Sequence, residues 1–169
     1  TAGYNTVDLT QLTESSQLVM ILLMLIGGAP GSTAGGFKVT TAAVFFLAAR
    51  AVFRRREDLQ SFGRRLPVET LRSASAILLM YVGLFLLGGM AISCVEGVPL
   101  LAALFETASA IGTVGLTLGL TPELEGISRM ILIFLMYFGR VGGLTLIYAV
   151  LPDSAAVPAQ MPQERINVG

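Results

Sequence analysis

Residues 112–117 read Gly112-Thr113-Val114-Gly115-Leu116-Thr117 and stand between a short apolar segment and a longer one. The preceding segment, 100–111, is apolar but too short to cross a bilayer, whose hydrocarbon core needs about 20 residues of helix. Non-helical backbone at membrane depth is tolerated only where it is buried in protein or lines a water-filled cavity. A short helix followed by Gly/Thr-rich backbone, between two spanning helices, therefore indicates a pore loop.

The composition places this loop in a membrane protein. Hydrophobic residues make up 54% of the 169 residues and charged residues 13%, with a mean hydropathy of +0.76. Soluble domains usually contain about 25% charged residues. The segment 73–95 carries no charge, 130–151 carries only Arg140, and 18–53 is apolar but interrupted by glycines. Pro122 and Glu123 are predicted to open the last spanning helix, which runs through Leu151. We therefore predict an all-α membrane protein in a lipid bilayer, built of helix–pore loop–helix units.

Several classes of function are excluded by what the chain lacks. It has no histidine and one cysteine, Cys94, which excludes histidine-based metal sites and Ser–His or Cys–His pairs within the chain. Phe37 separates Gly36 from Lys38, so the Gly-Lys-Ser/Thr signature of a phosphate-binding loop is absent. The formal net charge is zero, which offers no electrostatic case for nucleic acid. We expect no enzyme activity and no organic cofactor.

A second filter-like turn stands at the start of the chain. Residues 1–6 resemble 113–117, and Gly3 and Gly115 differ by 112 positions. The same offset, without a gap, aligns further pairs: Leu12 with Leu124, Ser16 with Ser128, Met24 with Met136 and Gly27 with Gly139. We therefore predict an internal repeat, with Thr1 inside a pore loop whose earlier part lies upstream. The predicted divisions are 1–68, 69–152 and a tail, 153–169.

Both turns are candidates for a filter of backbone carbonyls. A dehydrated monovalent cation needs oxygen ligands that replace its water, and carbonyls from several loops around one axis supply them. Glycine suits such a segment because its backbone takes conformations forbidden to other residues. The candidate ion-binding residues are Thr1, Ala2, Gly3, Tyr4, Asn5, Thr113, Val114, Gly115, Leu116 and Thr117.

Between the apolar segments lies a break that is a candidate gate. Five glycines and one proline in residues 27–36 preclude a regular helix. The repeat aligns Gly28 with Arg140, so the break lies at the depth of that charge. The candidate gate comprises Gly27, Gly28, Ala29, Pro30, Gly31, Ser32, Thr33, Ala34, Gly35 and Gly36, with Lys38 and Arg140. Two alternatives remain: glycines that only allow close helix packing, and cations that pair with carbonyls for structural reasons.

Glu106 and an arginine-rich loop each have two possible roles. Glu106 either supports the short helix or binds an ion directly. An arginine-rich loop between two apolar stretches stays in the cytoplasm, so it is a topology signal, with a partner site as the alternative. Its members are Arg54, Arg55, Arg56, Arg64, Arg65 and Arg72. This loop and the C-terminus are predicted to share the cytoplasmic side of a multi-pass protein.

Together these motifs resemble the Trk/Ktr/HKT superfamily of potassium transporters. The resemblance rests on residues 1–6, 27–38, 105–107 with 112–117, and 139–142, and the tail 162–169 is similar to that of the Ktr membrane subunit. It implies four linked units around a central pore, of which the chain represents two, the first only partly. It also implies a gating loop under the filter that faces Arg140, a homodimer, and a cytosolic nucleotide-binding regulatory ring. Gly143 stands where the family leads us to expect proline.

The function predicted from the sequence is potassium uptake across the cell membrane, through a carbonyl filter above a Gly-rich gate. Potassium is the substrate ion, and sodium is a candidate activator. The remaining partner is the rest of the same protein. The alternative is a non-conducting membrane scaffold whose glycines serve helix packing.

Overall fold

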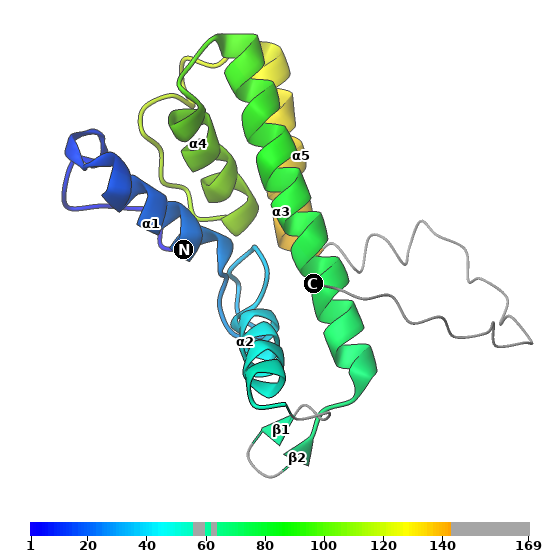
Figure 1. Ribbon diagram of the computed structural model, residues 1–169. Helices are drawn as coiled ribbons and strands as arrows, with labels where there is room; N and C mark the ends of the chain where they lie inside the picture. Colours follow the sequence, from blue (N-terminus) through cyan, green and yellow to red (C-terminus); the bar gives the residue numbers. More distant parts are fainter. Residues whose placement is uncertain (56–59, 62–63, 143–169) are drawn as a thin grey trace, which may run out of the picture.

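The computed structural model describes residues 1–55, 60–61 and 64–142. Arg56, Gly143, the predicted helix end at Leu151 and the predicted tail lie outside the described residues. The described part is helical, as predicted (Figure 1). Its elements are the 3-10 turn η1 (Leu9–Gln11), α1 (Glu14–Leu25), α2 (Val39–Phe53), α3 (Val68–Glu96), α4 (Leu100–Gly112) and α5 (Gly126–Val141), with a two-residue antiparallel pair, β1 (Gln60–Ser61) and β2 (Arg64–Arg65).

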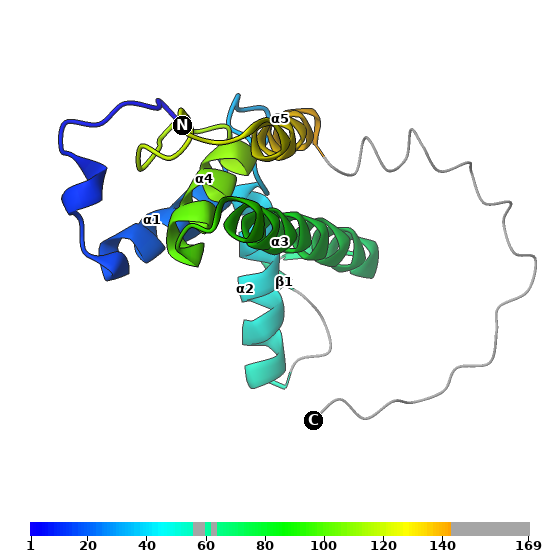
Figure 2. The ribbon, with the colours of Figure 1, turned by 90° about the horizontal axis from the view of Figure 1, so that it is seen from above.

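The short helix α4 lies at the centre of the structure. It packs against α1, α3 and α5, and Figures 1 and 2 show it between α1 on one side and the α3–α5 pair on the other. Every residue from Phe105 to Gly112 is buried. A 13-residue helix extends about 20 Å at 1.5 Å per residue, less than a bilayer core. The predicted short helix is therefore confirmed, and it is enclosed by its neighbours.

The chain leaves α3 and enters α5 at the same end of the α3–α5 pair, and α4 lies between these two points along the chain. Gly97, with φ of +66°, ends α3 in a left-handed turn, and the chain then runs back through α4. The segment after α4 returns toward the start of α5, which descends beside α3 (Figure 1). The backbone N–H of Glu125 donates to Glu96 Oε1 over 2.9 Å and joins the two ends. Among the described helices, only the 29-residue α3 is long and apolar enough to cross a membrane.

The starts of α1 and α5 agree with the predicted repeat, but α5 begins later than the sequence predicts. α1 begins at Glu14 and α5 at Gly126, which stand 112 positions apart. The prediction that Pro122 and Glu123 open the last helix is wrong. Glu123 N–H donates to the carbonyl of Leu120 in a turn, and Glu125 is still extended, so the helix begins only at Gly126.

Glycines allow the backbones to approach one another at the C-terminal end of α4. A Cβ at Gly139 of α5 would overlap the carbonyl oxygen of Ile111. A Cβ at Gly112 would lie 2.5 Å from the carbonyl oxygen of Met24, at the end of α1. Real Cβ atoms do not come this close, so α1 and α5 reach this point only because these positions carry no side chain.

We expect Gly139→Ala to destabilise the protein, because α5 must move away from Ile111 to make room for the methyl group. Overpacking of this kind costs about 1–3 kcal/mol. The matched control is Gly83→Ala in α3, where a Cβ meets no atom within 4 Å and helix propensity improves by up to about 1 kcal/mol. Thermal unfolding of the detergent-purified intact protein measures both. Equal midpoints for the two variants would contradict the close-packing account.

Candidate functional site

The structure brings the two candidate filter segments together. We call residues 1–5 the first filter segment and residues 113–117 the second. A Cβ at Gly3 would lie 2.5 Å from the carbonyl oxygen of Val114 and 3.5 Å from Cα of Gly115. Gly3 and Gly115 have φ of +78° and +89°, a region that favours glycine. The two glycines that the repeat aligns are thus neighbours in space with similar backbones.

The second filter segment begins in a strained turn. Thr113 follows α4 with φ of +50° and ψ of 41°, in the left-handed region. This conformation is unusual for a β-branched residue and costs roughly 1–3 kcal/mol. The turn is held by two backbone hydrogen bonds, from Thr113 N–H to Ala110 and from Val114 N–H to Ser109. It redirects the chain from the end of α4 into the filter segment.

Glu106 anchors the chain beyond the filter segment. Its side chain is 3% exposed. Oε1 accepts hydrogen bonds from Thr117 Oγ1 at 2.6 Å and from Leu118 N–H at 2.9 Å, and Oε2 accepts one from Thr121 Oγ1. Of the two alternatives for Glu106, these contacts favour support over direct ion binding. The spacing along the chain predicts none of these partners, because they depend on how the returning segment lies against α4.

The Gly-rich loop, residues 27–36, is closed at its base by backbone hydrogen bonds. Gly27 N–H donates to Phe37 over 2.7 Å, and Val39 N–H donates to Gly28 over 3.3 Å. A Cβ at Gly27 would overlap the carbonyl oxygen of Gly35, so the two arms of the loop touch. The loop is therefore a defined closed structure between α1 and α2, as the predicted helix break requires.

Two positively charged side chains donate hydrogen bonds to carbonyl oxygens of this loop. Lys38 Nζ donates to Ala34 at 2.6 Å and to Ser32 at 3.5 Å. Arg140 Nη1, from α5, donates to the carbonyl of Thr33 over 2.5 Å. The repeat places Arg140 at the depth of the loop, and the structure joins the two directly. Three carbonyls of the loop thus gain charged donors.

The loop also touches the base of the second filter segment. Gly35 N–H donates to Thr113 Oγ1 at 2.9 Å and to the carbonyl of Gly112 at 3.2 Å. A Cβ at Gly35 would lie 2.7 Å from the carbonyl oxygen of Ile111. Filter segment, end of α4 and Gly-rich loop are therefore in direct contact.

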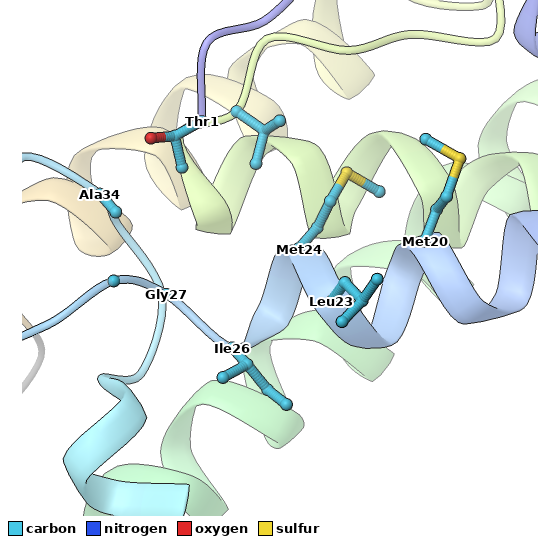
Figure 3. Close-up of a pocket in the computed structure, with 9 residues that line it drawn as sticks. Thr1, Met20, Leu23, Met24, Ile26, Gly27 and Ala34 are labelled. Atoms are coloured by element: carbon cyan, nitrogen blue, oxygen red, sulfur yellow. The ribbon is translucent and has the colours of Figure 1, made fainter.

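Two cavities run along these contacts. One of about 500 Å³ is bordered by Glu106, both ends of the second filter segment and Arg140. The other, of about 420 Å³, is bordered by Thr1, Val114, Gly27 and Ala34, with residues of α1 along its side. Figure 3 shows Thr1 above the loop residues, and Met20 and Met24 projecting from α1 beside it. The second cavity therefore extends from both filter segments to the loop, whereas the first extends from the second filter segment to Arg140.

Comparison with known proteins finds a cation-transport family and relatives named as potassium uptake proteins. The model of the TrkH family, described as cation transport protein, matches residues 1–157. The chain is 41% identical over 170 residues to Ktr system potassium uptake protein B of Vibrio alginolyticus, with 100% of the chain and 37% of that relative covered. It is 35% identical over 175 residues to potassium/sodium uptake protein NtpJ of Enterococcus hirae, with 100% of the chain and 39% of the relative covered.

A third relative, Ktr system potassium uptake protein B of Bacillus subtilis, is 38% identical over 149 residues. The aligned residues cover 88% of the chain and 34% of that relative. The chain thus spans little more than a third of the length of these relatives.

We expect Glu106→Ala to lower the thermal midpoint of the intact protein by more than about 2 °C. The substitution leaves up to three donors without an acceptor, and each buried unsatisfied group costs about 1–3 kcal/mol. Glu106→Gln keeps one acceptor oxygen and should lose less. The control is Glu123→Ala, an exposed carboxylate in the same region. If Glu106→Ala unfolds at the same temperature as Glu123→Ala, Glu106 does not anchor the returning segment.

Proposed function

The chain belongs to the TrkH family of cation transport proteins, and from this premise we propose that it forms part of a potassium-uptake pore in the cell membrane. The family is one of transporters rather than enzymes, as the sequence predicts. The observation that carries the proposal is the apposition of Gly3 and Gly115 next to a loop held by two cations. The names of the relatives support potassium as the ion, with sodium as a second ion.

In this proposal the carbonyl oxygens of residues 1–5 and 113–117 face one axis and bind dehydrated potassium. The remaining carbonyls come from the parts of the protein that the chain does not contain. Two features support the assignment: both segments carry a glycine with positive φ, and both border cavities. Rings of backbone carbonyls are the established means of replacing a cation's hydration shell.

The Gly-rich loop is the proposed gate. Its closed conformation is held by donors from three directions: Lys38, Arg140 and its own base. Its glycines make other conformations accessible at low cost. The positive charge of Arg140 also opposes a cation beneath the filter. At about 8 Å and an effective dielectric constant of about 20, two unit charges repel by about 2 kcal/mol.

The proposed assembly extends beyond this chain. Because the chain spans about a third of its relatives, it requires the rest of the same protein, with the first two units and the start of the third. A homodimer and a cytosolic nucleotide-binding regulatory ring are further proposed partners, the latter supported by relatives named as parts of a Ktr system. The arginine-rich loop and the C-terminus are proposed to lie on the cytoplasmic side.

The competing function is a non-conducting scaffold whose glycines serve only helix packing. Gly139 and Gly112 do serve packing, since the backbones of α4, α5 and α1 meet there. Gly31 does not, because a Cβ there would meet no atom within 4 Å.

We expect Gly115→Ser to lower potassium-over-sodium selectivity more than it lowers the amount of folded protein. A side chain at φ of +89° strains the backbone that presents the carbonyls. Uptake of both ions in cells that lack other uptake systems measures the ratio. The control is Gly126→Ser at the start of α5, where a Cβ meets no atom within 4 Å. An unchanged ratio in Gly115→Ser would refute the filter assignment. Absence of potassium uptake by the folded, unmodified protein would favour the scaffold.

We expect Arg140→Ala to raise the maximal potassium uptake rate and to leave selectivity largely intact. The substitution removes both the hydrogen bond to Thr33 and the charge beneath the filter. Arg129→Ala is the matched control, because Arg129 also lies on α5 but bonds the carbonyl of Pro122, away from the loop. Velocity is measured against potassium concentration at known expression. If Arg140→Ala and Arg129→Ala both transport at the unmodified rate, the loop is a packing device and not a gate.

A further inference from the structure

We propose that the hydroxyl of Thr113 is a latch that holds the Gly-rich loop closed against the filter. In this role Thr113 is a positioning residue of the gate, in addition to lending its carbonyl to the filter. The inference rests on the proposed function, because it assigns one contact within the proposed gate. It concerns the side chain of Thr113 and the amide of Gly35, which are 78 positions apart in the chain.

The geometry supports this role at the loop end of the contact. Gly35 is buried, and its N–H divides between Thr113 Oγ1 at 2.9 Å and the carbonyl of Gly112 at 3.2 Å. A Cβ on Gly35 would meet Thr113 Cγ2 and the carbonyl oxygen of Ile111, each at 2.7 Å. The loop therefore has no room for a side chain here and presses its backbone directly against Thr113. A buried amide of this kind needs its acceptors.

The conformation of Thr113 supports the role at the filter end. The residue occupies the left-handed region, where glycine or asparagine is preferred and a β-branched side chain is strained. A glycine would relieve that strain, but it has no hydroxyl to offer Gly35. The hydrogen bond that Thr113 Oγ1 accepts from Gly35 N–H therefore explains why a threonine occupies this strained position. Strain at such a position persists only where surrounding contacts stabilise it.

The latch differs from the other attachments of the loop. Lys38 belongs to the base of the loop itself and Arg140 to α5, whereas Thr113 is part of the second filter segment. A backbone movement at Thr113 shifts its Oγ1 relative to Gly35 N–H. Filter and gate are therefore coupled by one hydrogen bond, and the coupling acts in both directions. Loss of the hydroxyl weakens the closed state of the loop.

The test compares Thr113→Val, which replaces the hydroxyl by a methyl group, with Thr113→Ser, which restores it. In the intact protein, Thr113→Val should raise the maximal potassium uptake rate by about two- to tenfold, the effect of one ordinary hydrogen bond. Thr113→Ser, which keeps a hydroxyl at this position, should transport potassium at the rate of the unmodified protein. Thr113→Ala, which also lacks the hydroxyl and has no β-branch, repeats the test if the valine variant does not reach the membrane.

A second background separates a latch from an ion ligand. Deletion of residues 29–32 removes the tip of the loop, whose turn is closed by the Ser32 N–H to Ala29 hydrogen bond. In this background Thr113→Val should have no further effect on the rate, because there is no closed loop to hold. A fall in rate in both backgrounds would mean that the hydroxyl binds the ion, and an unchanged rate in the full loop would mean that the contact is idle. Either result overturns the latch. If the unmodified protein itself takes up no potassium, it is the proposed function that fails.

Discussion

The backbone at the C-terminal end of α4 is the contact on which the rest of the structure depends. The carbonyl of Ile111 lies against Gly139 of α5 and Gly35 of the loop, and Gly112 lies against the carbonyl of Met24. Side chains at these glycines would separate α4 from its neighbours. The turn at Thr113 starts from this point, so the filter segment and the Gly-rich loop take their positions from one packed junction. A displacement of α4 would reach both at once.

Backbone groups outside the regular helices explain much of the remaining structure. The Gly-rich loop interrupts the apolar stretch between α1 and α2, and lipid cannot satisfy its carbonyls. Lys38 and Arg140 supply charged donors to three of them. The segment after the filter has the complementary need, and Glu106 accepts from two hydroxyls and one amide there. Basic side chains therefore donate to carbonyls of the loop, and the carboxylate of Glu106 accepts from donors beyond the second filter segment. Each charge satisfies irregular backbone that the helices cannot.

The sequence predicts those features that depend on periodicity and offset. Apolar length identifies α3 and the short α4, glycine content identifies the break at 27–36, and the 112-residue offset anticipates the contact of Arg140 with the loop. The sequence predicts the start of α5 too early, because Pro122 suits the first turn of a helix, whereas here Pro122 lies in a turn and its carbonyl accepts from Arg129. The sequence does not predict the partners of Glu106 or the contact of Thr113 with Gly35. They depend on how the backbone folds back after α4, which neither spacing nor residue type specifies.

The central claim is that the carbonyls of residues 1–5 and 113–117 bind the transported ion. It is tested most directly by a crystal structure of the intact protein with rubidium in place of potassium, using the anomalous signal of rubidium. The account predicts a peak on the axis between these segments, with backbone oxygens, including those near Gly3 and Gly115, as its ligands. Carbonyls of 113–116 that all point into protein or lipid, with no rubidium between the two segments, would contradict it.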